Sequence, residues 1–288
     1  MCGIFGTINK TRKRLDTGLI RSLTLANRER GKESLGYFDS HENMLKSGDD
    51  PIDVLATKEC RDWLDRAEQQ QSWFVCGHTR YSTRGSVCDK NAHPFRYGKI
   101  IGSHNGIVSA PNEYTVDSEY LIDLLDKNNS DYQTALQDDW GYWTLGWFDT
   151  AQQAFYLCVH DNTCGIADHR GAWYFSSDPD HLMSSLGCNE VMRLESGSVV
   201  KFTPDGNMTW CKKFTSKYQH SYKKDTRTSG NPYSNYSHYS GTGTGATGSR
   251  SGGGSVTVRD PEQFIRDYDE EFRNAWQEYV HQYAAAAE

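Results

Sequence analysis

Met1-Cys2-Gly3-Ile4-Phe5-Gly6 opens the sequence and decides how the rest of it is interpreted. We expect Met1 to be removed, because a second residue as small as Cys lets an aminopeptidase reach the bond. Cys2 then carries a thiol that titrates near ~8.5 and an α-amino group that titrates near ~7.7–8.0, so one residue holds a nucleophile and its base. Gly3 and Gly6 allow substrate or backbone to approach closely. The alternative is a small core cysteine that opens a buried strand.

Composition limits the classes of protein that this chain can be. Its 288 residues suffice for a large core, and the formal charge of −7 argues against a general nucleic-acid binder. No apolar run reaches membrane-spanning length and no secretion signal opens the chain, so we expect a cytoplasmic protein that binds neither membranes nor nucleic acid. The eight cysteines form no C-x-x-C pair, which indicates free thiols in a reducing compartment.

A metal centre is the one cofactor that the sequence makes worth considering. Cys76, His78, Cys88 and His93 lie within a short stretch, but their C-x-H and C-x4-H spacings match no standard structural zinc pattern. The sequence therefore predicts no metal site, and nothing in it calls for another cofactor.

Hydrophobic periodicity predicts a mixture of helices and strands. The first half alternates them, and the spacing of apolar residues then turns to that of strands. Helices are predicted over 15–26, ended by Gly31, over 60–67, and after a cap at 117–119. Strands are predicted over 34–39, 73–78, 99–103, 141–149, 154–161, 172–176, 191–194, 199–203 and 208–214. This pattern favours two packed sheets covered by helices.

The character of the chain changes near residue 216. Residues 1–215 are expected to form one domain, and 216–256 a flexible linker, because Gly, Ser, Thr, Asn and Tyr dominate there and few aliphatic side chains could be buried. Beyond it, Asp260-Pro261 is a helix-start signature. Residues 257–288 are therefore expected to form an amphipathic C-terminal helix.

Four further segments carry the groups that a thiol attacking an amide would need. Each has an ordinary explanation alone: a helix stop, a polar loop, a turn and a helix cap. They are Arg30-Gly31-Lys32-Glu33-Ser34-Leu35-Gly36, then Gly77-His78-Thr79-Arg80-Tyr81-Ser82-Thr83-Arg84-Gly85 with Asn91-Ala92-His93-Pro94-Phe95, then His104-Asn105-Gly106, and Asp117-Ser118-Glu119. In this order they closely resemble the class II glutamine amidotransferase domain, over roughly residues 1 to 215. That resemblance implies an α+β fold, the four-layer αββα sandwich of the N-terminal nucleophile hydrolases.

The resemblance also implies catalytic roles. Cys2 would attack the side-chain amide carbon of glutamine, and its own amine would shuttle the proton to the leaving ammonia. The side-chain amide of Asn105 and the backbone N–H of Gly106 would form the oxyanion hole.

Substrate-binding roles are implied as well. Arg80, with help from the Thr83 region, would hold the α-carboxylate of glutamine, and Asp117 would pair with the α-ammonium. Asp117 could instead be a plain helix cap. Arg30 would order the N-terminal loop.

The chain departs from the family pattern at three places. Tyr81 stands where Trp is common, which keeps an aromatic wall, and Arg84 stands where many members have His. A second cation there would tighten glutamine binding or admit a more acidic substrate. The stretch from Asn105 to Asp117 is about half as long as in the larger synthase-linked members, which puts the lid and the Asp117 assignment in question.

Three functions follow from these observations. The first is a glutamine-hydrolysing amidotransferase subunit that releases glutamate and ammonia through a Cys2 thioester, with a separate ammonia-accepting enzyme as partner, since nothing after residue 215 resembles an acceptor domain. The second is a stand-alone γ-glutamyl amide hydrolase, which Arg84 and the short segment favour. The third is a catalytically silent binding module whose C-terminal helix recruits partners.

Overall fold

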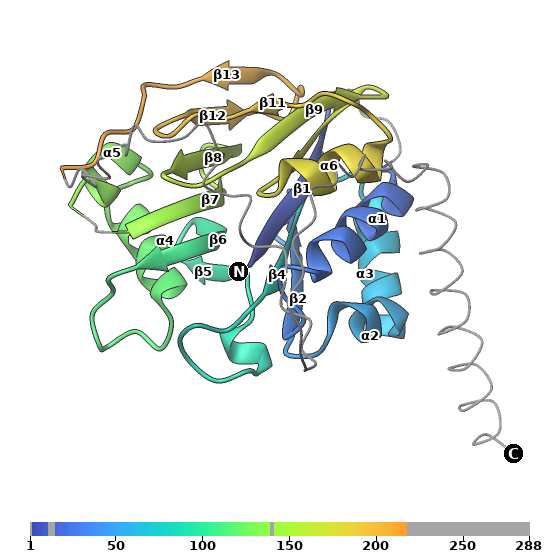
Figure 1. The fold of residues 1–288 in the computed structure, drawn as a ribbon, viewed down its shortest axis with the longest axis horizontal. Helices are drawn as coiled ribbons and strands as arrows, with labels where there is room; N and C mark the ends of the chain where they lie inside the picture. The colour runs from blue at the N-terminus through green and yellow to red at the C-terminus, as the bar shows by residue number, and fades with distance from the viewer. Residues whose placement is uncertain (1, 11–14, 139–140, 218–288) are drawn as a thin grey trace, which may run out of the picture. The chain divides into compact units, whose positions relative to one another are not determined.

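The computed structural model describes residues 2–10, 15–138 and 141–217, and all structural statements below refer to those residues. Its strands pair antiparallel in two sheets (Figure 1). Sheet A has the order β11-β9-β10-β1-β4-β2-β3, with β1 Gly3–Asn9, β2 Ser34–Asp39, β3 Met44–Ser47, β4 Phe74–Arg80, β9 Gly165–His169, β10 Ala172–Ser176 and β11 Met192–Arg193. Sheet B has the order β13-β12-β8-β7-β6-β5, with β5 Phe95–Tyr97, β6 Ile100–Val108, β7 Gly141–Asp149, β8 Ala154–His160, β12 Val199–Phe202 and β13 Met208–Trp210.

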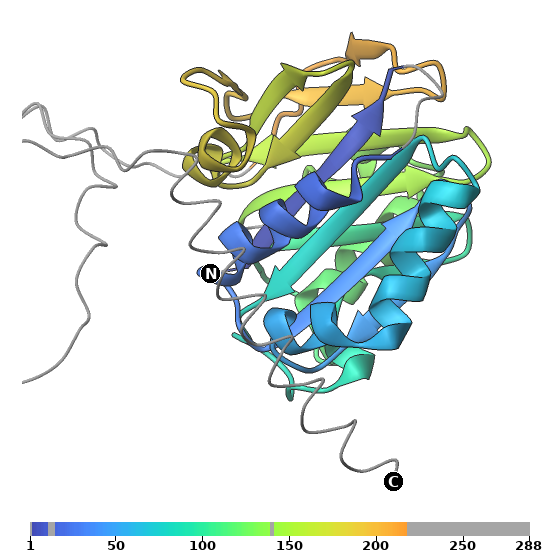
Figure 2. The same ribbon diagram turned by 90° about the vertical axis from the view of Figure 1, so that its right-hand side faces the viewer.

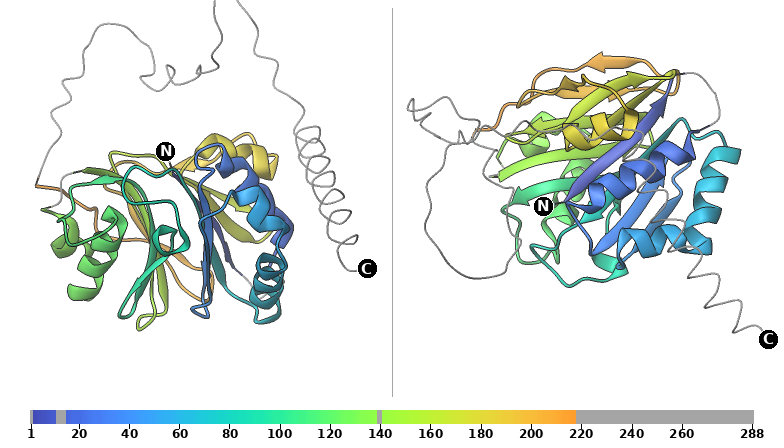
Figure 3. Two further views of the ribbon diagram at one scale, coloured as in Figure 1. Left: turned by 90° about the horizontal axis from the view of Figure 1, so that it is seen from below. Right: turned by 45° about the vertical axis from the view of Figure 1, so that its right-hand side comes forward.

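Helices cover the outer faces of the two sheets. Sheet A carries α1 Thr17–Arg28, α2 Pro51–Ala56, α3 Lys58–Gln69 and α6 Pro179–Leu186, and Figure 2 looks onto this helical layer. Sheet B carries α4 Asp117–Lys127 and α5 Tyr132–Leu136. A single 3-10 turn, Asp89–Asn91, lies in the loop before β5. The left view of Figure 3 shows the four layers in succession: helices, sheet, sheet, helices.

Three apolar clusters hold these layers together. One packs α1, α2, α3 and α6 on sheet A, and a second packs α4 and α5 on sheet B. The third lies between the sheets and is rich in aromatic rings, including Phe74, Phe148 and Phe155. Burial of large apolar side chains on both faces of each sheet is what stabilises the sandwich.

Strand β4 shows how the core leads to the functional site. Its side chains alternate between the two faces of sheet A, so Phe74 and Cys76 enter the cluster between the sheets while Val75 packs under the helices. By the same alternation His78 and Arg80 continue the inner face. The inner face therefore changes from apolar to polar toward the end of the strand.

The predicted α+β class and four-layer αββα sandwich are confirmed. The strands over 34–39, 141–149 and 172–176 are found with the predicted bounds, and the others are found within a few residues. The predictions had no counterpart for β3, β5, β9, α2, α5 and α6.

Three local predictions were wrong. Helix α1 ends at Arg28 with Glu29 as its cap, so Gly31 is not the stop; a Cβ there would lie 2.4 Å from the backbone of Arg80. Residues 104–106 are not a turn, because β6 continues to Val108. The cap of α4 is Val116, without a side-chain hydrogen bond, so the alternative that Asp117 is a plain helix cap is also wrong.

The predicted domain arrangement stays a prediction. Apart from its first two residues, the linker 216–256 lies outside the described residues, and so does the whole helix 257–288. Among the helices that the structure describes, none combines the length and the apolar character needed to cross a membrane.

Candidate active site

The pairing of β1 with β4 brings Cys2 to the edge of sheet A beside the loop that follows β4. Gly3 lies opposite Thr79 in this antiparallel pair, so the residue before β1 meets the residues at the end of β4. The backbone N–H of Tyr81 donates to the Cys2 sulfur at 3.4 Å, and the thiol contacts the Tyr81 carbonyl oxygen at 3.4 Å. The nucleophile predicted from the sequence is thus held by main-chain groups.

The surroundings of Cys2 set the protonation of its thiol. Burial of the thiol raises its pKa, although the residue as a whole keeps some exposure. The Tyr81 backbone hydrogen bond and the positive charge of Arg80 lower it, and the negative charge of Asp117 raises it. Because the net shift is upward, the thiol is protonated at neutral pH and needs a base before it can attack.

Arg30 fixes the backbone of the nucleophile. Its Nε donates to the Cys2 carbonyl oxygen at 2.8 Å, and its Nη1 donates to Asp178 Oδ2 at 2.7 Å. Asp178 is also the N-cap of α6, where its Oδ1 accepts the Asp180 N–H. Sequence reasoning missed Asp178, because nothing in the spacing links it to a residue 148 positions earlier.

A narrow cleft opens beside the sulfur, and we refer to it as the Cys2 cleft. It brings together residues from the start of β1, the loop after β4, the end of β6 and the start of α4. Its lining residues are Cys2, Arg80, Tyr81, Thr83, Arg84, His93, His104, Gly106, Val116, Asp117 and Ser118. Of the site residues predicted from the sequence, only Arg30 and Asn105 are not among them.

Arg80 is almost completely buried, with 4% of its surface exposed. Its Nη1 donates to the Ser86 carbonyl at 3.2 Å and its Nη2 to the Arg84 carbonyl at 2.6 Å. These two bonds orient the guanidinium at the wall of the cleft. A guanidinium has five N–H donors, so the group keeps capacity for an anion.

Arg84 lies in the loop after β4, four residues beyond Arg80, and its side chain binds protein groups. Its Nη1 donates to the Ala110 carbonyl at 3.0 Å, and its Nη2 donates to the carbonyls of Pro111 at 3.0 Å and Tyr114 at 2.8 Å. The side chain therefore ties the loop after β4 to the short segment between β6 and α4. These bonds hold the shortened segment in place.

Asp117 and Gly106 line the cleft as well, and Asn105 precedes Gly106 in β6. Asp117 is buried, and its Oδ2 accepts the Val108 N–H at 3.1 Å. Gly106 has no room for a side chain, since a Cβ would lie 2.0 Å from the Tyr142 carbonyl oxygen. Asn105 is 2% exposed; its carbonyl accepts from Asn162, while its Nδ2 has no hydrogen-bond partner among the described residues. That amide is a donor without an acceptor in the described part of the chain.

Two buried histidines, His93 and His104, line the cleft, and a third, His78, lies against them; sequence reasoning gave none of the three a role. His78 comes from β4, His93 from the loop before β5, and His104 from β6. Burial is the main cause that lowers the pKa of all three, to about 3 for His78. Each stands in a segment that carried the family resemblance, which was the available signal.

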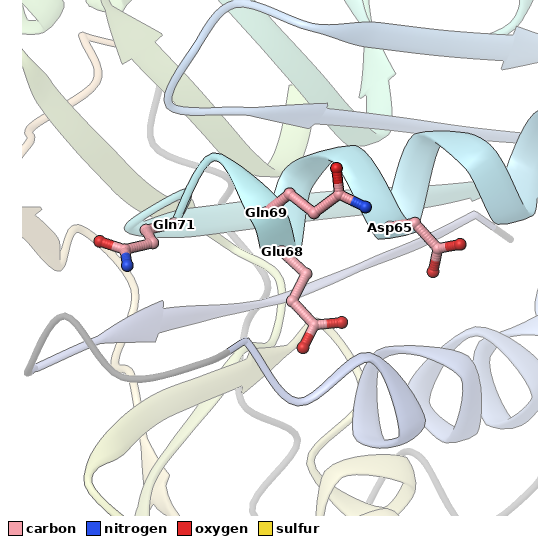
Figure 4. Close-up of a pocket in the computed structure, with 4 residues that line it drawn as sticks. All are labelled: Asp65, Glu68, Gln69 and Gln71. Carbon is pink, nitrogen blue, oxygen red and sulfur yellow. The ribbon is translucent and has the colours of Figure 1, made fainter.

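The structure has a second hollow, on α3 (Figure 4). Its described lining residues are Asp65, Glu68, Gln69 and Gln71, so it offers carboxylates and amides. These residues include neither a nucleophile nor a cation. The nucleophile and the substrate-binding cations expected from the sequence line the Cys2 cleft instead.

Comparison with known proteins points to one family. No family model matches the chain. A glutamine–fructose-6-phosphate aminotransferase (isomerizing) of Campylobacter jejuni is 28% identical over 226 residues, which are 69% of this chain and 36% of the relative. The enzyme of the same name from Pyrococcus horikoshii is 37% identical over 112 residues, 38% of this chain and 17% of the relative. The chain contains a class II glutamine amidotransferase domain.

Solved structures share the fold of this amidotransferase domain. The glutamine phosphoribosylpyrophosphate amidotransferase of B. subtilis, complexed with ADP and GMP, superposes with a TM-score of 0.56 at 17% identity, covering 74% of this chain and 49% of that one. An allosteric regulatory enzyme of purine biosynthesis gives a TM-score of 0.58 at the same identity and coverage. The chain spans well under two thirds of the length of the curated relatives that it matches.

Proposed function

We propose that this domain hydrolyses glutamine to glutamate and ammonia through a Cys2 thioester, and that the ammonia passes to a separate partner enzyme. One observation carries the proposal: the Cys2 thiol, the Arg80 cation and the Asp117 anion line one narrow cleft. Opposite charges within one cleft suit the α-carboxylate and α-ammonium of a free amino acid. The side-chain amide of that amino acid would then reach the sulfur.

The reaction begins with the removal of a proton from the thiol. Since burial raises the Cys2 pKa, a base is needed, and the α-amino group of Cys2 serves once Met1 has been removed. The sulfur attacks the amide carbon, and the C–N bond breaks as the nitrogen takes the proton and leaves as ammonia. Water then attacks the thioester, the C–S bond breaks, and glutamate and the thiol are released.

The charge on the amide oxygen needs donors at the moment of attack. Asn105 supplies them best, because its buried Nδ2 has no partner among the described residues and is therefore free to donate. Gly106, which lines the cleft, would supply a backbone N–H. A preorganised pair of this kind typically contributes ~10²–10³ in rate per donor.

This chain matches only part of each curated relative. The curated relatives' names join glutamine to fructose 6-phosphate, but the match covers 36% of the Campylobacter jejuni protein. We propose that another polypeptide supplies the acceptor chemistry and that residues 257–288 bind it. The scattered cysteines of the sequence support the cytosol as the compartment.

The alternative of a γ-glutamyl amide hydrolase rested on Arg84 and on the shortened segment, and Arg84 has protein partners in the structure. Arg84 favoured it as a second cation for an acidic substrate, yet three main-chain carbonyls occupy its guanidinium. Product analysis with glutamine and with γ-glutamyl amides distinguishes the two enzymes.

The test of the proposed function is glutamate release by the purified chain. We expect wild-type protein with an N-terminal Cys2 to hydrolyse glutamine, Cys2→Ala to be inactive but folded, and Cys88→Ala to keep most of its activity. Intact mass of the glutamine-treated enzyme should show the thioester. Active protein that retains Met1 would contradict the mechanism, and a folded wild-type chain without glutaminase activity would favour the binding module.

A further inference from the structure

The buried histidines at the Cys2 cleft form one cluster. The rings of His78 and His93 lie with their centroids 3.7 Å apart, and His78 Nε2 lies 3.0 Å from the His104 carbonyl oxygen. The exposed fractions of His78, His93 and His104 are 0%, 3% and 2%. His93 and His104 line the same cleft as Cys2.

Most ring nitrogens of this cluster have no hydrogen-bond partner among the described residues. They are His78 Nδ1, His93 Nδ1, His93 Nε2 and His104 Nε2. His104 Nδ1 is paired with Ser118 Oγ at 3.0 Å. A buried polar atom without a partner lowers the free energy of unfolding by about 1–3 kcal/mol. Four such nitrogens in one cluster therefore indicate a binding site for a ligand that can form hydrogen bonds.

The hydrogen-bonding character of the cluster follows from its tautomers. Because a carbonyl can only accept, His78 Nε2 carries the proton of its bond to His104, and His78 Nδ1 is an acceptor. His93 is a neutral ring with one donor and one acceptor. Burial lowers its pKa most, and the neighbouring His78 and His104 rings and the positive side chains of Arg80 and Lys46 lower it further. The cluster therefore offers both kinds of partner to a small molecule.

Two classes of ligand do not suit the cluster. The rings of His78 and His93 are tilted by 36° to each other, and the described residues contain no group of His, Cys, Asp or Glu side chains that could hold a metal. A cation such as ammonium is disfavoured by Arg80 and Lys46, the positive side chains that act on His93.

We propose that His93 and His104, backed by His78, form a seat for one small neutral molecule that both donates and accepts hydrogen bonds. Under the proposed function, on which this inference rests, two such molecules use the Cys2 cleft. Ammonia leaves when the C–N bond of the amide breaks, and water enters to break the C–S bond of the thioester. The seat would hold ammonia in its neutral, nucleophilic form, or would hold the water that replaces it.

Partition of the thioester between two nucleophiles tests the seat. The full chain is given glutamine and increasing hydroxylamine, a small neutral amine that attacks the thioester carbon, releases the thiol and gives γ-glutamyl hydroxamate. The ratio of hydroxamate to glutamate is measured for wild type, His93→Phe and His93→Gln. Phe keeps the ring but removes both nitrogens, whereas the Gln amide restores a donor and an acceptor.

The expected result is a ratio that changes about tenfold in His93→Phe, which corresponds to about 1.4 kcal/mol, and returns toward wild type in His93→Gln. A fall in the ratio assigns the seat to ammonia. A rise, with thioester accumulating in the mass spectrum, assigns it to water. An unchanged ratio in an active His93→Phe enzyme overturns the seat but not the proposed function, whereas a wild type that releases no glutamate overturns the function itself.

Two further variants keep the test decisive. His93 donates to no described protein group, so Phe should cost little stability; His93→Leu is measured in the same way if His93→Phe does not fold. The matched control is His169→Phe, which replaces a partly buried histidine on β9 beside Tyr174, away from the Cys2 cleft. It should leave the ratio unchanged.

Discussion

Arg84 donates a hydrogen bond from Nη2 to the Tyr114 carbonyl oxygen at 2.8 Å and thereby joins two loops that lie 30 residues apart in the sequence. With its bonds to Ala110 and Pro111, this side chain holds the short segment that leads into Val116 and Asp117. Both of those residues line the Cys2 cleft. The position of Asp117 therefore depends on Arg84 as well as on α4.

Replacing Arg84 by Ala should loosen the segment and raise KM for glutamine roughly tenfold, with less effect on kcat. Three bonds from a charged donor are lost, but the side chain is half-exposed, so we expect the free energy of unfolding to fall by only about 1–2 kcal/mol. Glutaminase kinetics and thermal melts measure both effects. Arg96→Ala, which removes a surface pair with Glu42, is the matched control and should leave KM unchanged; an equal rise in both variants would contradict the role of Arg84.

Arg80→Lys should raise KM for glutamine strongly. The guanidinium bonds the carbonyls of Ser86 and Arg84 while it keeps donors for a carboxylate, and a single ammonium cannot reproduce that planar arrangement. Steady-state kinetics with glutamine provide the measurement. A variant with wild-type KM and a much lower kcat would move Arg80 from substrate binding to the chemical step.

Much of the sandwich could be predicted because its strands carry regular patterns. Residues 141–149 and β4 are rich in aromatic and β-branched residues, which is the composition of strands. Helices α2 and α6 were missed although Asp50-Pro51 and Asp178-Pro179 carry the same start signature that was recognised at Asp260-Pro261. Their shortness, six and eight residues, left too little apolar periodicity to support the signal.

The contents of the cleft could be predicted, but their partners could not. Motif order gave Cys2, Arg80 and Asp117, which line one cleft. The carbonyl partners of Arg84 could not be predicted, because a charge in a loop carries no information about which carbonyls will face it. Asp178 was not expected at all, since its contact with Arg30 depends on the long-range placement of α6.

Asn105→Ala should lower kcat by ~10²–10³ and change KM little. Its Nδ2 has no partner among the described residues, so its loss leaves no protein acceptor unsatisfied and acts on the charge that appears only in the transition state. Pre-steady-state formation of the thioester separates this effect from later hydrolysis. Loss of binding with normal turnover would place the oxyanion donors elsewhere.

Acid should destabilise the domain before its carboxylates titrate. Burial lowers the pKa of His78 to about 3 and also lowers those of His93 and His104, whereas an unfolded histidine titrates near ~6.5. Below about pH 6.5 the histidines of the unfolded chain bind protons, whereas the buried native histidines stay neutral. Their contribution to the free energy of unfolding is therefore fully present above about pH 6.5 and decreases as the pH falls toward about 3. Each such histidine contributes a slope of up to about 1.4 kcal/mol per pH unit. Urea titrations between about pH 6.5 and 5 should show this slope. His93→Phe should reduce the slope by the contribution of about one proton. A wild-type protein whose stability does not change across that pH range would mean that the cluster is not neutral and buried in solution.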